Sequence, residues 1–277
     1  MDQLSFLRPD SNWLPPENLP DLSGAKVIGL DVETCDPNLL TNGPGGVRND
    51  GKLVGISVAT DTGFKGYFPI AHEGGDNLDN NAVLRWARAT LGGTQTKVGA
   101  NLLYDLEWLR QAGIDVKGDL RDIQVAEPLL DEEKNGGYSL ANLSKFYLNK
   151  DKDETLLREA AQAFGVDPKG GLWKLPARYV GPYAEADAAL PLEIYKLQEK
   201  KIKEQGLWDI FDLESRLLNM TLDMRFKGVR IDVDKAEQLN EKLLRHKKHY
   251  VYVCSCVFLC LVRRVITGPH ELCLRFC

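Results

Sequence analysis

The chain has 277 residues, of which 43% are hydrophobic and 27% charged, and its formal net charge is −5. This composition excludes wholesale disorder, and the length suggests about two domains. The net charge excludes a uniformly basic nucleic-acid coat protein, but it is compatible with an enzyme that holds a few nucleotides through a local basic patch.

The sequence indicates a cytoplasmic protein with no membrane partner. No apolar run approaches the ~20 residues of a membrane span, and the N-terminus does not resemble a secretory signal. Only Cys35 lies in the first 250 residues, which fits a reducing compartment without a disulfide framework.

The first half of the chain predicts strands followed by alternating strands and helices. Residues 1–25 contain four prolines and predict an extended arm, and residues 36–51 predict a loop. The apolar run 26–33 predicts a buried strand. Runs 53–60 and 64–70 predict a hairpin. Further on, the pattern predicts a helix at 80–91, a strand at 96–100, a helix at 102–112, and a short strand at 120–125 leading into a helix. This order predicts an α/β fold in which helices cover the faces of a mixed sheet.

The second half reads as helical. Between residues 140 and 205 the pattern predicts helices with breaks at 165–171 and 181–182, where glycine and proline occur. A further helical stretch follows from residue 204, then a strand at 228–231 and another helix. This last part predicts the start of a second domain.

Two acidic residues mark the end of the first predicted strand. Asp31 and Glu33 occupy alternate positions, so their side chains point to the same face. Two carboxylates held together repel each other unless one is protonated or a cation neutralises them, and Mg²⁺ prefers such oxygen ligands. A solvated strand end is the alternative interpretation.

Two further carboxylates stand at junctions or on helices. Asp105 lies one turn after Asn101, and Asn101 is also placed to cap the helix. Asp187 follows Tyr183 by four residues, so the two share a helix face, where the phenol could orient a water. The alternative is an amphipathic helix with a half-buried Tyr183.

Three pairs of residues, taken in order, resemble a known family: Asp31 with Glu33, Asn101 with Asp105, and Tyr183 with Asp187. They are similar to the three exonuclease motifs of the DnaQ-like (DEDD) superfamily in its tyrosine-bearing branch. Over about residues 24–205, the surrounding sequence most resembles the proofreading domain of phage-type family A DNA polymerases. Gly137 to Leu140 also resemble the segment before the third motif.

The resemblance implies an RNase H-like fold with a mixed five-stranded sheet flanked by helices and followed by a partial helical segment. It implies a 3′-5′ exonuclease that removes nucleoside monophosphates from single-stranded or frayed DNA 3′ ends, in proofreading. By the same resemblance, Asp31, Glu33, Asp105 and Asp187 hold two Mg²⁺ or Mn²⁺ ions for phosphodiester hydrolysis, and Tyr183 positions the attacking water. A polymerase or replisome component is the implied partner, in a bacterial or phage-infected cell.

Candidate substrate contacts are less specific. Basic residues between 145 and 178, Lys152 among them, alternate with aromatic residues, as in proteins that bind a single strand. Of these we select Lys174 and Arg178; a solvated helical face is the alternative. The resemblance adds Asn101 and Leu102 as contacts of the terminal nucleotide.

The C-terminal part predicts an incomplete second domain, because residues 213–232 resemble the entry into a family A polymerase domain. The predicted organisation is therefore an arm at 1–25, an exonuclease domain at 26–205, the start of a polymerase-type domain at 206–245, and a poorly structured Cys-rich tail at 246–277. The tail's cysteines and histidine fit no strong zinc pattern. The polymerase catalytic region is not expected in this chain.

Two other functions remain open at this point. An RNase D-like 3′-5′ exoribonuclease shares the same three motifs, although residues 213–232 favour DNA. A truncated, non-catalytic remnant that binds single strands is the second alternative.

Overall fold

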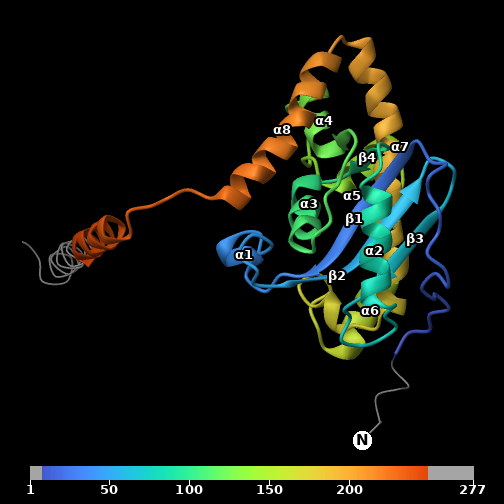
Figure 1. The fold of residues 1–277 in the computed structure, drawn as a ribbon, viewed down its shortest axis with the longest axis horizontal. Coiled ribbons are helices and arrows are strands. Elements are labelled where there is room, and N and C mark those ends of the chain that lie inside the picture. The colour runs from blue at the N-terminus through green and yellow to red at the C-terminus, as the bar shows by residue number, and fades with distance from the viewer. Residues whose placement is uncertain (1–7, 249–277) are drawn as a thin grey trace, which may run out of the picture. The chain divides into compact units, whose positions relative to one another are not determined.

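The structure is a computed structural model that describes residues 8–248 (Figure 1). The chain divides into two compact units, Met1–Lys227 and Gly228–Cys277. In the described part of the second unit, residues 233–248 are helical, as predicted, but residues 228–231 form no strand. The predicted strand is wrong because Gly228 has a φ of 68°, in the left-handed region, and no neighbouring strand of the described chain pairs with this segment. The Cys-rich tail beyond residue 248 lies outside the described residues.

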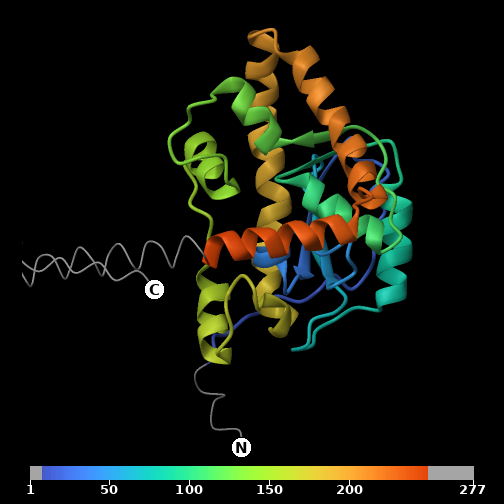
Figure 2. The ribbon, with the colours of Figure 1, turned by 90° about the vertical axis from the view of Figure 1, so that its left-hand side faces the viewer.

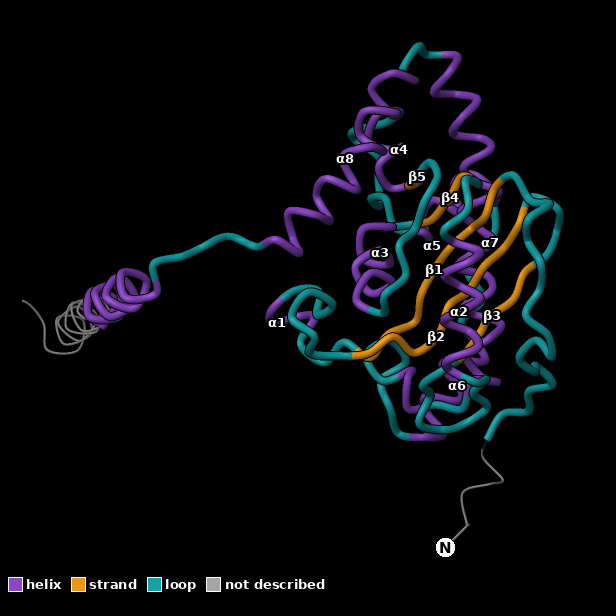
Figure 3. The backbone as a smooth tube through the Cα atoms, viewed as in Figure 1, coloured by secondary structure: helices purple, strands orange, loops and turns teal. Residues whose placement is uncertain are grey.

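A five-stranded sheet forms the centre of the first unit (Figure 3). Its strands are β1 (Val27–Cys35), β2 (Lys52–Thr60), β3 (Lys65–Pro69), β4 (Thr96–Gly99) and β5 (Leu120–Asp122), in the order β3-β2-β1-β4-β5. The central strand β1 pairs antiparallel with β2 and parallel with β4. The predicted α/β fold with a mixed five-stranded sheet is confirmed.

The helices are α1 (Leu39–Asn42), α2 (Asn80–Leu91), α3 (Leu102–Gln111), α4 (Ile123–Leu130), α5 (Leu140–Leu148), α6 (Thr155–Phe164), α7 (Ala177–Glu204) and α8 (Trp208–Lys227), with a 3-10 turn η2 (Leu172–Lys174). The segment 36–51, predicted as a loop, contains the single turn α1. The predicted helical run from residue 140 also breaks earlier than expected, since Asn149 ends α5 with a left-handed φ of 50°. None of the helices formed by the described residues is long and apolar enough to cross a lipid bilayer.

Successive side chains of β1 point to opposite faces of the sheet, so that one face of the strand contributes to the hydrophobic core and the other carries the two acidic residues. Ile28, Leu30 and Val32 are buried in the cluster that contains the apolar faces of α2 and α3. Gly29, Asp31 and Glu33 occupy the intervening positions and face α7. Helix α7 lies on the other side of the sheet from α2 (Figure 1). A Cβ at Gly29 would lie 2.1 Å from the carbonyl oxygen of Ala188 in α7. The glycine therefore lets α7 approach β1 closely, next to Asp187.

Helix α7 runs through Gly181 and Pro182, so the break predicted there is wrong. Pro182 has no N–H to donate to the carbonyl of Arg178, four residues earlier. The hydroxyl of Ser11 donates to that carbonyl instead, at 2.7 Å. Gly181 leaves room for the indole of Trp13, whose ring a Cβ would meet at 2.1 Å. The N-terminal arm thus supplies a donor for this carbonyl and fills the space beside Gly181.

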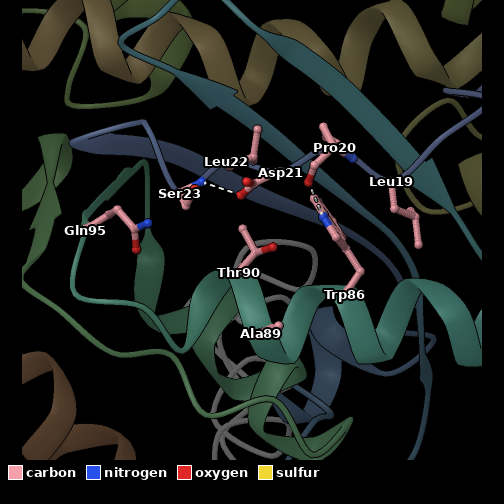
Figure 4. A pocket seen from close by; sticks show the side chains of 9 residues that line it. All are labelled: Leu19, Pro20, Asp21, Leu22, Ser23, Trp86, Ala89, Thr90 and Gln95. Atoms are coloured by element: carbon pink, nitrogen blue, oxygen red, sulfur yellow. Dashed lines mark hydrogen bonds between the residues drawn. The ribbon is translucent and has the colours of Figure 1, made fainter.

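The arm also packs beside α2 (Figure 4). The indole nitrogen of Trp86 donates to the carbonyl of Pro20 at 2.7 Å, and Leu22 is buried in the core. A hollow of about 340 Å³ lies between this part of the arm and α2. None of the predicted catalytic carboxylates lines it.

Helices α7 and α8 meet at a short turn (Figure 2), where Gly206 has a φ of 69°. Helix α8 buries Phe211, Leu218 and Leu222 against the body and contacts α3, α4 and β5. Arg110 of α3 pairs with Asp223 of α8 at 2.6 Å. Helix α8 is therefore part of the same compact unit as the sheet.

Candidate active site

Three of the predicted carboxylates converge where β1 faces α7. Asp31, Glu33 and Asp187 each offer an oxygen, and these three oxygens lie within 4.8 Å of one another. The first two come from alternate positions of a strand, and the third from a helix more than 150 residues later. Glu33 and Asp187 are each only 7% exposed.

The fourth carboxylate, Asp105, reaches the same place from the first turn of α3. Its Oδ1 accepts a hydrogen bond from the backbone N–H of Val32, between Asp31 and Glu33, at 3.3 Å. The side chain is 3% exposed. All four carboxylates therefore surround the end of β1.

Asp122, at the end of β5, fixes the start of α3. Its carboxylate accepts from the backbone N–H groups of Asn101 and Leu102, at 3.1 and 2.7 Å. Asn101 adopts a left-handed φ of 67°, and its side chain makes no cap hydrogen bond. The cap predicted for Asn101 is thus supplied by the neighbouring strand, and Asp122 holds the turn that carries Asp105.

The electrostatics of the cluster favour a bound cation. Burial is the largest cause that raises the pKa of Asp31, Glu33 and Asp105, and the charges of neighbouring carboxylates raise it further. Burial also raises the pKa of Asp187, although Lys152 opposes this shift. Asp105 Oδ2 and Asp187 Oδ1 are buried without a hydrogen-bond partner among the described residues. Buried carboxylate oxygens that repel one another and lack donors fit a hard divalent cation such as Mg²⁺.

Tyr183 stands beside this cluster, half-buried on the same face of α7 as Asp187. Burial raises the pKa of its hydroxyl well above the ordinary value, and the charges of Glu33, Asp187 and Asp31 raise it further. The phenol therefore stays protonated at neutral pH. Ser57 of β2 donates to the carbonyl oxygen of Asp31 at 3.2 Å and so helps to fix that residue.

A cleft of about 880 Å³ opens at the carboxylates. Glu33 and Tyr183 line it at the cluster, and Asn101 and Tyr104 line it from the start of α3. Two basic residues, Lys169 and Arg225, also line it. The cleft therefore combines an acidic end with basic groups that can contact phosphates.

The four predicted substrate contacts are placed differently. Asn101 is exposed at the cleft. Of the described residues that line the cleft, none is Leu102, Lys174 or Arg178. Leu102 is fully buried, Arg178 forms a two-pronged ion pair with Asp76 at 2.6 Å, and the Lys174 ammonium lies 5.0 Å from the ring centre of Trp173.

Sequence reasoning missed three residues of this region. Lys152, grouped with strand-binding lysines, instead pairs with Asp187. Asp122 carried a usable signal, because an aspartate between a short strand and a helix is a common N-cap. Arg225 carried none, since its place at the cleft depends on how α8 packs.

Residues 17–203 match a family described as 3′-5′ exonuclease. The chain belongs to this family. The chain is also 44% identical over 248 residues to a DNA-directed DNA polymerase of Pseudomonas phage M6, and this match covers 85% of the chain and 37% of the polymerase. The predicted relationship to phage family A polymerases is confirmed, and the chain spans about a third of the length of that relative.

Solved structures share the fold of the exonuclease domain. NrnC of Brucella melitensis with bound Mg²⁺ has a TM-score of 0.53 at 16% identity, covering 78% of this chain and 92% of NrnC. Escherichia coli RNase D, an exoribonuclease involved in structured RNA processing, has a TM-score of 0.51 at 18% identity, covering 74% of this chain and 46% of RNase D. The predicted RNase H-like exonuclease fold is confirmed.

Proposed function

We propose that this protein removes nucleoside monophosphates from DNA 3′ ends by a two-cation hydrolysis of the proofreading type. The observation that carries the proposal is the convergence of Asp31, Glu33, Asp105 and Asp187 from three distant segments. In a nuclease of this family, such a cluster of oxygen donors is the expected cradle for Mg²⁺ or Mn²⁺. These cations, when bound, supply an activated water and neutralise charge on the phosphate.

The side chains have separate tasks in this mechanism. The four carboxylates bind the cations, and Asp122 and Ser57 keep Asp105 and Asp31 in place. Tyr183 orients the attacking water through its hydroxyl; it does not remove the proton, because its pKa is raised. Asn101 would contact the terminal nucleotide, and Arg225 and Lys169, which line the same cleft, would contact phosphates further along the strand.

DNA is the preferred substrate in this proposal. Its support is the 44% identity to a phage DNA polymerase, which extends over 248 residues and hence beyond the part that matches the exonuclease family. The natural partner would be a polymerase or replisome component in a bacterial or phage-infected cell. An RNase D-like activity on RNA is the competing outcome.

Labelled oligonucleotides test activity, polarity and substrate together. Single strands of DNA and RNA of the same sequence, labelled at either end, are incubated with the protein in Mg²⁺ or in EDTA. We expect Mg²⁺-dependent release of labelled mononucleotide from 3′-labelled DNA and stepwise shortening of 5′-labelled DNA. The variant Asp31→Ala controls for contaminating nucleases. If RNA is digested faster than DNA, RNA is the preferred substrate. If neither polymer is digested, the proposal is refuted.

A further inference from the structure

Lys152 lies against the carboxylate cluster, in the segment between α5 and α6. Its Nζ is 2.6 Å from Asp187 Oδ2 and 3.9 Å from the ring centre of Tyr183. The side chain is only 10% exposed. A buried ammonium thus contacts two residues of the proposed active site at once.

The backbone around Lys152 is fixed rather than loosely tethered. The hydroxyl of Ser144, in α5, donates to the carbonyl of Lys150 at 3.0 Å. Asp153 accepts from the N–H of Thr155 at 3.0 Å, where α6 begins. The ammonium is therefore directed at Asp187 by structure on both sides of it.

Of the ion pairs formed by residues 8–248, the Lys152–Asp187 pair is the one that reaches the four carboxylates. A lysine ammonium is a compact, strongly hydrated point charge. A divalent cation bound to Asp187 would lie close to it, and two positive charges at short range in a partly buried site repel each other strongly. The ammonium and the cation must share or exchange the same carboxylate.

Glu154 offers the ammonium a second position. Its Oε1 lies 3.9 Å from Lys152 Nζ, so a small side-chain movement replaces one carboxylate by another. Such an exchange would keep the lysine paired with a carboxylate while Asp187 binds a divalent cation.

We propose that Lys152 is a positioning residue that holds Asp187 in place and competes with a divalent cation for it. This inference rests on the proposed function, because it assumes that the carboxylates bind such a cation. It assigns to Lys152 control over how readily the cation enters. Removal of the ammonium should therefore tighten cation binding. It should also lower the thermal stability of the cation-free protein.

Direct Mn²⁺ binding to the full 277-residue chain tests the proposal. Free Mn²⁺ is measured by electron paramagnetic resonance in titrations of the wild type, Lys152→Met and Lys150→Met. Lys150 is the matched control, because its ammonium pairs with Glu193 at 2.7 Å with both side chains about half exposed. We expect Lys152→Met to bind Mn²⁺ about tenfold more tightly, and Lys150→Met to bind it like the wild type.

Thermal unfolding gives a second readout. Lys152→Met in EDTA should melt below the wild type, because buried carboxylates lose their counter-ion, and Mn²⁺ should raise its melting temperature by more than it raises that of the wild type. Lys152→Gln, which keeps a hydrogen-bond donor near Asp187, serves if the methionine variant does not fold.

The outcomes separate this inference from the proposed function. Unchanged or weaker Mn²⁺ binding in a folded, uncharged Lys152 variant overturns the competition, even if the wild type digests DNA. A wild type that binds no Mn²⁺ and digests nothing overturns both proposals.

Discussion

At the scale of single residues, burial shifts the pKa of each group in the candidate site and so determines which chemical role it suits. Tyr183 and the carboxylates lie close together and are largely removed from water, which shifts each group towards its uncharged form. For the phenol, the uncharged form is the useful one, since a protonated hydroxyl can orient a water. For the carboxylates, the same shift favours a cation that restores their charge. In the proposed mechanism, the environment therefore suits Tyr183 to orient a water and the carboxylates to bind a cation.

This division predicts unequal losses on substitution. Tyr183→Phe removes one orienting hydrogen bond and should lower the rate of nucleotide release by about 10²-fold. Asp31→Ala removes a cation ligand and should lower it by roughly 10³-fold or more. Initial rates on single-stranded DNA at saturating Mg²⁺ measure both. The pH profile of Tyr183→Phe should keep the wild-type shape, since the phenol does not titrate near neutral pH. A Tyr183→Phe protein as inactive as Asp31→Ala would contradict the assignment.

At the scale of elements, local patterns predict much of the fold. Alternation along β1 places Asp31 and Glu33 on one face, and the order of strands and helices predicts the mixed sheet. The errors arise where distant contacts override local signals. Helix α7 continues through Pro182, and Ser11, in the distant arm, donates to the carbonyl that the proline leaves free. Lys152 is read as a strand contact because nothing near it in sequence reveals that it pairs with Asp187.

His72 joins two elements on which the site depends. Its Nε2 lies 2.7 Å from the Tyr67 hydroxyl of β3, and its Nδ1 lies 2.9 Å from the carbonyl oxygen of Leu175, just before α7. Burial lowers the pKa of His72 from 6.5 to about 4. Below pH 6.5 the unfolded chain therefore takes up a proton that the folded protein does not, and stability is lost as the pH falls towards 4.

The contribution of His72 is measurable by urea unfolding at a series of pH values. Between pH 7 and 4.5, His72→Gln should lose about 2–3 kcal/mol less of its free energy of unfolding than the wild type. The comparison concerns the change with pH, because the variant also loses native contacts at every pH. His246→Gln, at an exposed position, is expected to follow the wild type. Parallel curves for His72→Gln and the wild type would refute this linkage.

At the scale of the whole molecule, α8 extends the site beyond the part that matches the exonuclease family. That match ends at residue 203, but Arg225 of α8 lines the cleft that opens at the carboxylates. Its guanidinium pairs with the buried carboxylate of Glu107 in α3 at 3.0 Å. The same carboxylate accepts from the N–H of Val47 at 3.0 Å. One buried acid thus fixes both a loop and a basic group at the cleft.

Arg225 is accordingly expected to affect the length of strand that the enzyme holds rather than the chemistry. Arg225→Gln should weaken binding of an eight-nucleotide DNA strand. It should also reduce the slope of log Kd against the logarithm of the salt concentration by about the amount that one phosphate contact contributes. Hydrolysis of the p-nitrophenyl ester of thymidine 5′-phosphate, which has no second phosphate, should be unchanged. Arg110→Gln is the matched control, because Arg110 also bridges α3 and α8 but is not among the residues lining the cleft. Equal losses in both variants, or a loss on the ester, would mean that Arg225 acts through the packing of α8 and not through the strand.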